Sequence, residues 1–139
     1  MLKFEHVTKV YGGKKALNDL SISFQSGHVY ALVGPNGSGK STLLKCIYRT
    51  LKPTSGTVLL DDVSLRTLSL KQSAKKIAVV AQHNHYNFDF TVKDVVMLGR
   101  APHKRMLDRD TKEDFQLVDT SLKQVGMQDF SERLFSSLS

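Results

Sequence analysis

The residues with the clearest chemistry form one glycine-rich stretch, Gly34-Pro35-Asn36-Gly37-Ser38-Gly39-Lys40-Ser41. It matches the pattern G-x-x-x-x-G-K-[ST], whose glycines let successive backbone N–H groups turn toward one anion. The lysine supplies a cation for the β- and γ-phosphates of a nucleotide, and the hydroxyl after it is a ligand for Mg²⁺. The pattern therefore predicts a phosphate-binding loop. The expected nucleotide-binding residues are Gly34, Pro35, Asn36, Gly37, Ser38, Gly39, Lys40, Ser41 and Thr42, with Lys40 also catalytic and Ser41 also a metal ligand.

Such a loop needs a strand before it and a helix after it, because the helix directs the positive end of its dipole at the bound anion. Residues 29–33 are apolar on both faces, which is typical of a central strand in a covered parallel sheet. After the loop, Leu43, Leu44 and Ile47 indicate an apolar helix face. We therefore expect a helix over about residues 40–50.

The rest of the chain alternates predicted strands with predicted helices, which indicates an α/β fold. We expect a β-rich, phosphate-loop part at residues 1–82 and a largely helical part at residues 83–139, together one incomplete domain. Strands are predicted at 2–6, 20–24, 57–60 and 77–81, with turns at 11–13 and 26–27. Helices are predicted at 69–75, at 91–98 with Thr91 as cap, and from Asp110, with Glu113 three residues later, to Gly126; the last buries Phe115, Val118, Leu122 and Val125.

Composition narrows the function classes. The 139 residues are 40% hydrophobic and 24% charged, close to the average for a globular protein. No run of about 20 apolar residues is present, so we expect no membrane-spanning helix. The single cysteine fits a reducing compartment, and we expect a cytoplasmic location. The formal charge is +7 but is spread along the chain, so we expect no nucleic-acid partner.

The stretch GPNGSGKSTLL, residues 34–44, resembles the ATP-binding subunits of ABC transporters. In that family an aromatic residue placed like Tyr11 stacks on the adenine of ATP, and a small residue like Ala16 lines the base and ribose site. Gln82 resembles the Q-loop glutamine, which implies contact with Mg²⁺ and the attacking water, and hence a catalytic and metal-binding role. The last residues, Leu138-Ser139, match the start of the family's Leu-Ser-Gly-Gly signature.

Residues 68–82 and 92–103 are most similar to the importers of ferric siderophores, haem and cobalamin. The resemblance implies ATP and Mg²⁺ as cofactors and transmembrane permease subunits as partners through the Q-loop region. It also implies a homodimer of the full-length subunit, an indirect link to a periplasmic or surface substrate-binding protein, and a peripheral position on the inner face of the cell membrane.

The resemblance covers only the first half, or slightly more, of such a subunit. The rest of the signature, the Walker B aspartate, the catalytic glutamate and the switch histidine do not occur in these 139 residues. We therefore expect this polypeptide to bind nucleotide at most, without useful hydrolysis. An alternative is a soluble ABC-type ATPase that acts on nucleic acid or the ribosome. A non-ABC P-loop kinase or GTPase ranks last, because it leaves Tyr11, Gln82 and Leu138-Ser139 as coincidences.

Overall fold

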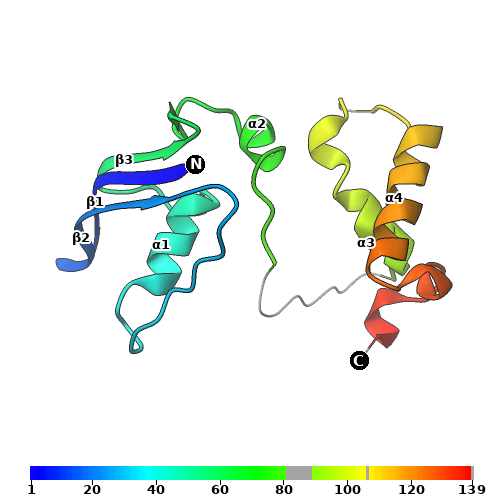
Figure 1. The fold of residues 1–139 in the computed structure, drawn as a ribbon, viewed down its shortest axis with the longest axis horizontal. Coiled ribbons are helices and arrows are strands. Elements are labelled where there is room, and N and C mark those ends of the chain that lie inside the picture. Colours follow the sequence, from blue (N-terminus) through cyan, green and yellow to red (C-terminus); the bar gives the residue numbers. More distant parts are fainter. Residues whose placement is uncertain (81–88, 106, 139) are drawn as a thin grey trace. The chain divides into compact units, whose positions relative to one another are not determined.

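The computed structural model describes residues 1–80, 89–105 and 107–138. These form two compact units, Met1–Val79 and Val80–Ser139 (Figure 1). The predicted division after residue 82 lies outside the described residues, as does Gln82 itself. Each unit has its own buried apolar cluster.

The first unit is built on a four-stranded antiparallel sheet with the strand order β2-β1-β3-β4 (Figure 1). The predicted turn at Gly12-Gly13 is confirmed: it joins β1 to β2, and Tyr11 pairs with Lys14 across it. At the other end of β1, Leu2 lies between Phe24 of β2 and Leu60 of β3. The strands are β1 Leu2–Tyr11, β2 Lys14–Phe24, β3 Ser55–Leu60 and β4 Val63–Ser64.

Two helices complete the first unit: α1, Lys40–Ile47, and α2, Leu70–Ala74. The core lies where α1 meets the sheet. Phe4 and Val7 of β1 are completely buried, and each such side chain contributes roughly 1.5–3 kcal/mol to folding. The buried cluster consists of Phe4, Val7, Leu17, Val58 and Leu65 with Leu43 and Cys46 of α1. The P-loop helix is therefore held by its inward face, which leaves its first turn at the surface.

Two predicted strands are absent. Residues 29–33 and 77–80 have no strand pairing among the described residues. The side chains of Val29, Val33 and Val80 are more than nine-tenths exposed. Apolar sequence alone does not make a strand, because the backbone N–H and C=O groups need a neighbouring strand to pair with. The strand prediction was wrong for these residues, and residue 81 lies outside the described part.

The second unit is helical, as predicted. Val92 of α3 packs with Val118 and Leu122 of α4 in its core. The predicted apolar face is only half correct, because Phe115 is 39% exposed and Val125 is 70% exposed. Val125 lies just past the helix end as its C-cap. The elements are α3 Val92–Leu98, η1 Ala101–His103, α4 Lys112–Gln124, η2 Gln128–Phe130 and η3 Phe135–Ser137.

The start of α4 differs by one residue from the prediction. Thr111, not Asp110, is the N-cap, and Asp114, not Glu113, completes the capping box. Asp114 is selected by its surroundings: its carboxylate also accepts from Arg100 Nε at 2.8 Å and pairs with Lys104 Nζ at 3.0 Å. The side chain is 6% exposed. A helix start that gives this buried carboxylate its hydrogen-bond partners is therefore favoured.

The end of α4 is as predicted. Gly126 has φ +68°, a left-handed conformation that glycine adopts without steric cost. The Met127 N–H donates to the Leu122 carbonyl at 2.8 Å, and the Gly126 N–H donates to the Lys123 carbonyl at 3.2 Å. These two hydrogen bonds form a Schellman motif. Met127 also packs against the cluster that contains Leu122.

Candidate nucleotide-binding site

The phosphate loop leads directly into α1, as the sequence predicts. Gly39 is the N-cap of α1 with φ +92°. A Cβ atom at this position would collide with the carbonyl oxygen of Ala16 and lie 3.2 Å from Leu17 Cδ2. Only glycine lets the loop pass this close to β2. The contact therefore fixes the loop against the sheet and directs the first turn of α1 outward.

The backbone N–H groups at the N-terminus of α1 are not capped by a side chain. The first turn of this helix holds no acidic residue. The first bond inside the helix runs from the Leu43 N–H to the Gly39 carbonyl at 2.9 Å. The N–H groups before Leu43 have no intrahelical acceptor, and the positive end of the helix dipole lies with them. This arrangement suits an anion such as phosphate.

Lys40 turns back onto its own loop. Its ammonium group donates to the carbonyl oxygens of Gly34 and Pro35, both at 2.7 Å, and lies 3.4 Å from Ser38 Oγ. All three acceptors are neutral. A phosphate would offer this cation an acceptor of opposite charge, which attracts it more strongly than the dipole of a neutral carbonyl does. The lysine is thus already placed at the loop, with partners that an anion can displace.

Ser41, the expected metal ligand, and Thr42, a further expected nucleotide-binding residue, lie at the same helix start. The Ser41 residue is exposed and Thr42 is half-buried. Mg²⁺ is commonly held by one or two protein oxygens together with substrate phosphates and water. A single hydroxyl beside a phosphate loop fits that requirement. Within the described residues no group of three or more His, Cys, Asp or Glu residues forms a separate metal site.

The two residues expected at the base lie on the β1–β2 hairpin. Tyr11 ends β1 and is 45% exposed. Ala16, half-buried in β2, is the residue whose carbonyl faces Gly39. The structure therefore brings Ala16 to the phosphate loop and puts Tyr11 on the same hairpin, opposite Lys14. Gln82 lies outside the described residues, so its catalytic and metal roles remain predictions.

The segment before Leu138 is held against the start of α3. The Val92 N–H donates to the Arg133 carbonyl at 2.9 Å, and the Phe135 N–H donates to the Phe90 carbonyl at 2.8 Å. Leu138 packs on the cluster around Val92. The residues that resemble the beginning of the signature thus belong to the helical unit, and Ser139 lies outside the described residues.

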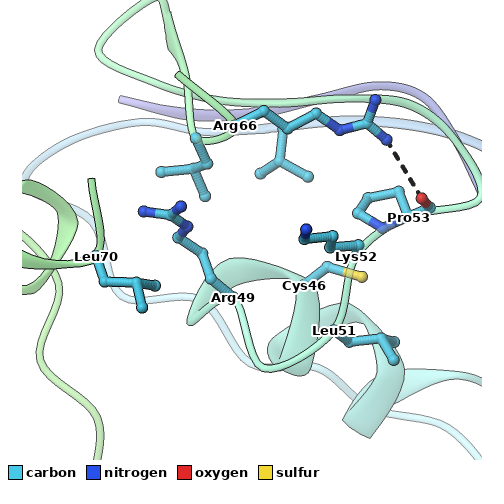
Figure 2. A pocket seen from close by; sticks show the side chains of 9 residues that line it. Cys46, Arg49, Leu51, Lys52, Pro53, Arg66 and Leu70 are labelled. Atoms are coloured by element: carbon cyan, nitrogen blue, oxygen red, sulfur yellow. Dashed lines mark hydrogen bonds between the residues drawn. The ribbon is translucent and has the colours of Figure 1, made fainter. Parts of the chain in front are cut away.

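A separate pocket lies at the other end of α1 and contains none of the predicted nucleotide-binding residues (Figure 2). Three basic side chains surround an apolar floor, and Arg66 donates to the Pro53 carbonyl at 3.2 Å. No sequence pattern marked this pocket, because its residues come from α1, β3 and the connecting segments up to α2, which only the fold brings together. Its lining consists of Cys46, Arg49, Leu51, Lys52, Pro53, Val58, Leu65, Arg66 and Leu70.

Comparison with known proteins gives one consistent result. The ABC transporter family matches residues 17–139. The chain is 35% identical over its whole length to the petrobactin import ATP-binding protein FpuC of Bacillus anthracis, of which it covers 51%. It is 34% identical over its whole length to the hemin import ATP-binding protein HmuV of Methylobacillus flagellatus, also covering 51%. Against the cobalamin import protein BtuD of Halobacterium salinarum the identity is 39% over 91% of the chain and 31% of that protein.

Solved structures agree with the sequence relatives. The ATP-binding cassette MJ0796, in a dimeric post-hydrolysis state bound to ADP and Pi, matches the whole chain with a TM-score of 0.82 and 29% identity, and 63% of that structure is covered. A nucleotide-free ATP-binding cassette from an ABC transporter matches with a TM-score of 0.84 and 25% identity, with 59% covered.

The chain spans about half the length of the curated relatives FpuC and HmuV. Among the described residues, no helix is long and apolar enough to cross a membrane. The family match nevertheless covers far more than half of this chain, and the glycine-rich loop leads directly into α1. The chain belongs to the ABC transporter family and carries the P-loop part of its ATP-binding cassette.

Proposed function

We propose that this chain supplies the Mg²⁺-ATP-binding part of the ATP-binding subunit of an ABC importer. The loop 34–39 and the first turn of α1 hold the phosphates, and Lys40 binds the β- and γ-phosphates. Ser41 is a ligand for Mg²⁺, and Thr42 contacts the α-phosphate. Tyr11 stacks on adenine, and Ala16 lines the base and ribose site. Gln82 completes the metal and water contacts.

One observation carries this proposal most strongly. The N-terminus of α1 has no cap and no acid, and the Lys40 ammonium lies on the loop carbonyls of Gly34 and Pro35. Donors without intrahelical acceptors and a cation with displaceable partners together form a site for a polyanion. The exposed Ser41 hydroxyl adds a metal ligand at the same place.

The cargo we propose is an iron-siderophore, haem or cobalamin-type compound. Support comes from relatives named for petrobactin, hemin and cobalamin import that match nearly the whole chain. On this proposal the complete subunit dimerises and contacts transmembrane permease subunits through the Q-loop region, on the inner face of the membrane. A periplasmic or surface substrate-binding protein acts through those permeases.

We further propose that residues 1–139 alone bind nucleotide without useful turnover. Hydrolysis would need the segments of the cassette beyond the half that this chain spans. Asp61 is not available as a general base, because its carboxylate is paired with the Met1 ammonium at 2.8 Å and with Lys76 Nζ at 3.0 Å. These partners lower the pKa of Asp61, with the hydrogen bond from the N-terminus as the largest cause.

Calorimetric titration of the chain with Mg²⁺-ATP tests the phosphate site. Lys40→Met should weaken binding by about tenfold or more, since one charge-assisted contact is lost. Lys45→Met is the matched control, because Lys45 lies on the same helix at its other end. It removes the same charge and should leave the affinity within about twofold. Equal affinities for the wild type and Lys40→Met, with α1 intact by circular dichroism, would contradict the proposed site.

A further inference from the structure

A lysine lies over the ring of the aromatic residue expected at the base. Lys9 and Tyr11 are two residues apart in β1, so their side chains share one face of the strand. The Lys9 ammonium is 5.3 Å from the centroid of the Tyr11 ring. That distance is within the range of a cation–π interaction, about 6 Å. No sequence motif marks this contact, although a spacing of two residues permits it.

The cation is also tethered. Lys9 Nζ donates to the Lys52 carbonyl at 2.9 Å, in the segment that follows α1. Two more hydrogen bonds join the same segment to β1. The Val10 N–H donates to Thr54 Oγ1 at 3.1 Å, and the Thr54 N–H donates to the Thr8 carbonyl at 2.8 Å. Lys9 therefore links the end of β1, where Tyr11 lies, to the chain leaving the P-loop helix.

Such a cation changes what the ring can bind. It covers one face of Tyr11, while the residue keeps 45% of its surface exposed. A cation over one face draws on the negative charge of the ring's π-system. The opposite face then repels the π-electrons of a stacked purine less, and offset stacking becomes more favourable.

We propose that Lys9 is a positioning residue for Tyr11, which holds the ring and strengthens its stacking on the adenine of ATP. The proposal rests on the proposed function, in which Tyr11 receives the base. Lys9 does not touch the phosphates on this view. Its effect should therefore depend on the presence of a base in the ligand, which separates it from a general attraction between a lysine and a polyanion.

The chain contains no tryptophan, so Tyr11→Trp provides a single fluorescent reporter at the site. In this background we would measure the affinity for Mg²⁺-ATP by quenching of the tryptophan and by calorimetry. The affinity for Mg²⁺-tripolyphosphate, which has no base, would be measured by calorimetry. Lys9→Met should weaken ATP binding by about two- to fivefold, the range of an exposed cation–π contact. Tripolyphosphate affinity should not change.

Two further variants complete the test. Lys9→Arg retains a cation that stacks on aromatic rings and should restore the ATP affinity. Lys14→Met is the matched control for charge, because Lys14 lies opposite position 11 across the hairpin; it should leave the ratio of the two affinities unchanged. Retained tripolyphosphate binding shows that each variant is folded.

The outcomes are distinct. If Lys9→Met weakens both ligands by the same factor, or neither, the positioning role is wrong. If Tyr11→Ala in the otherwise native chain leaves the ratio of ATP to tripolyphosphate affinity unchanged, then Tyr11 does not stack on adenine. That result overturns the proposed role of Tyr11 itself, whatever Lys9 does.

Discussion

The N-terminus of α1 and the N-termini of α3 and α4 solve the same problem in different ways. Every helix begins with backbone N–H groups that have no intrahelical acceptor. In α3 and α4 a Thr and Asp pair caps them: Thr91 with Asp94, and Thr111 with Asp114. In α1 the N-cap is Gly39, with no side-chain cap and no acid.

The contrast separates two helix starts that are closed by side chains of the chain itself from one that is not. A capping residue stabilises a helix start by about 1 kcal/mol, and α1 forgoes this contribution. Its stability comes instead from Leu43 and Cys46, which lie in the core.

The largest expected effect follows the loss of the α4 carboxylate. In Asp114→Asn the buried side chain no longer pairs as an anion with Arg100 and Lys104, and both cations lose a partner at 2.8 and 3.0 Å. Removing this carboxylate takes one charged partner from a partly buried ionic network, although Lys104 keeps its pairing with Asp110. We expect the largest fall in thermal stability of these variants, measured by circular dichroism. Glu113→Gln, an exposed neighbour in the same helix turn, should have little effect; equal losses would contradict the assignment.

The same carboxylate predicts a pH dependence. The Thr111 N–H, then Arg100 and Lys104, hold the pKa of Asp114 well below its usual range. A carboxyl whose pKa is lower in the folded than in the unfolded state stabilises the fold fully above the unfolded value of about 3.9. That stability is lost as the pH falls toward the folded pKa. Urea unfolding from about pH 6 to pH 2 should show a steeper loss for the wild type than for Asp114→Asn. Parallel curves would mean that Asp114 does not drive the acid sensitivity.

An acidic residue in the first turn of α1 should make this helix start resemble those of α3 and α4, which each carry at least one. Thr42→Glu places a carboxylate at the third helical position, which stabilises the helix by about 0.3–1 kcal/mol. The same charge faces the phosphates, so Mg²⁺-ATP affinity should fall by about tenfold. Thr50→Glu adds the same charge at an exposed residue just past α1 and should bind ATP nearly as the wild type does. Unchanged affinity in Thr42→Glu would show that the phosphates do not bind at this helix start.

The smallest effect is expected from uncapping α3. Thr91 Oγ1 accepts from the Asp94 N–H at 3.1 Å, and the Thr91 N–H donates to Asp94 Oδ2 at 2.9 Å. Thr91→Val keeps the shape and removes the hydroxyl, which should lower the free energy of unfolding by about 1 kcal/mol. Thr120→Val is the control, since that hydroxyl only donates to the Gln116 carbonyl within α4. ATP affinity should not change in either variant, and a loss in Thr91→Val no greater than in Thr120→Val would show that the cap contributes little.

Local sequence predicted the local features well. The glycine pattern located the phosphate loop and the start of α1, and the Gly12-Gly13 turn located the β1–β2 hairpin. Thr91 and Gly126 were correctly expected at helix ends. The position of the α4 cap was predicted one residue too early. It depends on the contacts of Asp114 with Arg100 and Lys104, which no local sequence pattern shows.

The sequence by itself determined where the glycine-rich loop lies and that a helix follows it, because backbone freedom at glycine acts over a few adjacent residues. Tertiary structure decided the rest. Whether residues 29–33 and 77–80 become strands depends on partners that an apolar pattern does not specify, and the described residues offer none. The passage of Gly39 beside Ala16 and the position of Lys9 over Tyr11 arise only once β1, β2 and the chain around α1 are packed together.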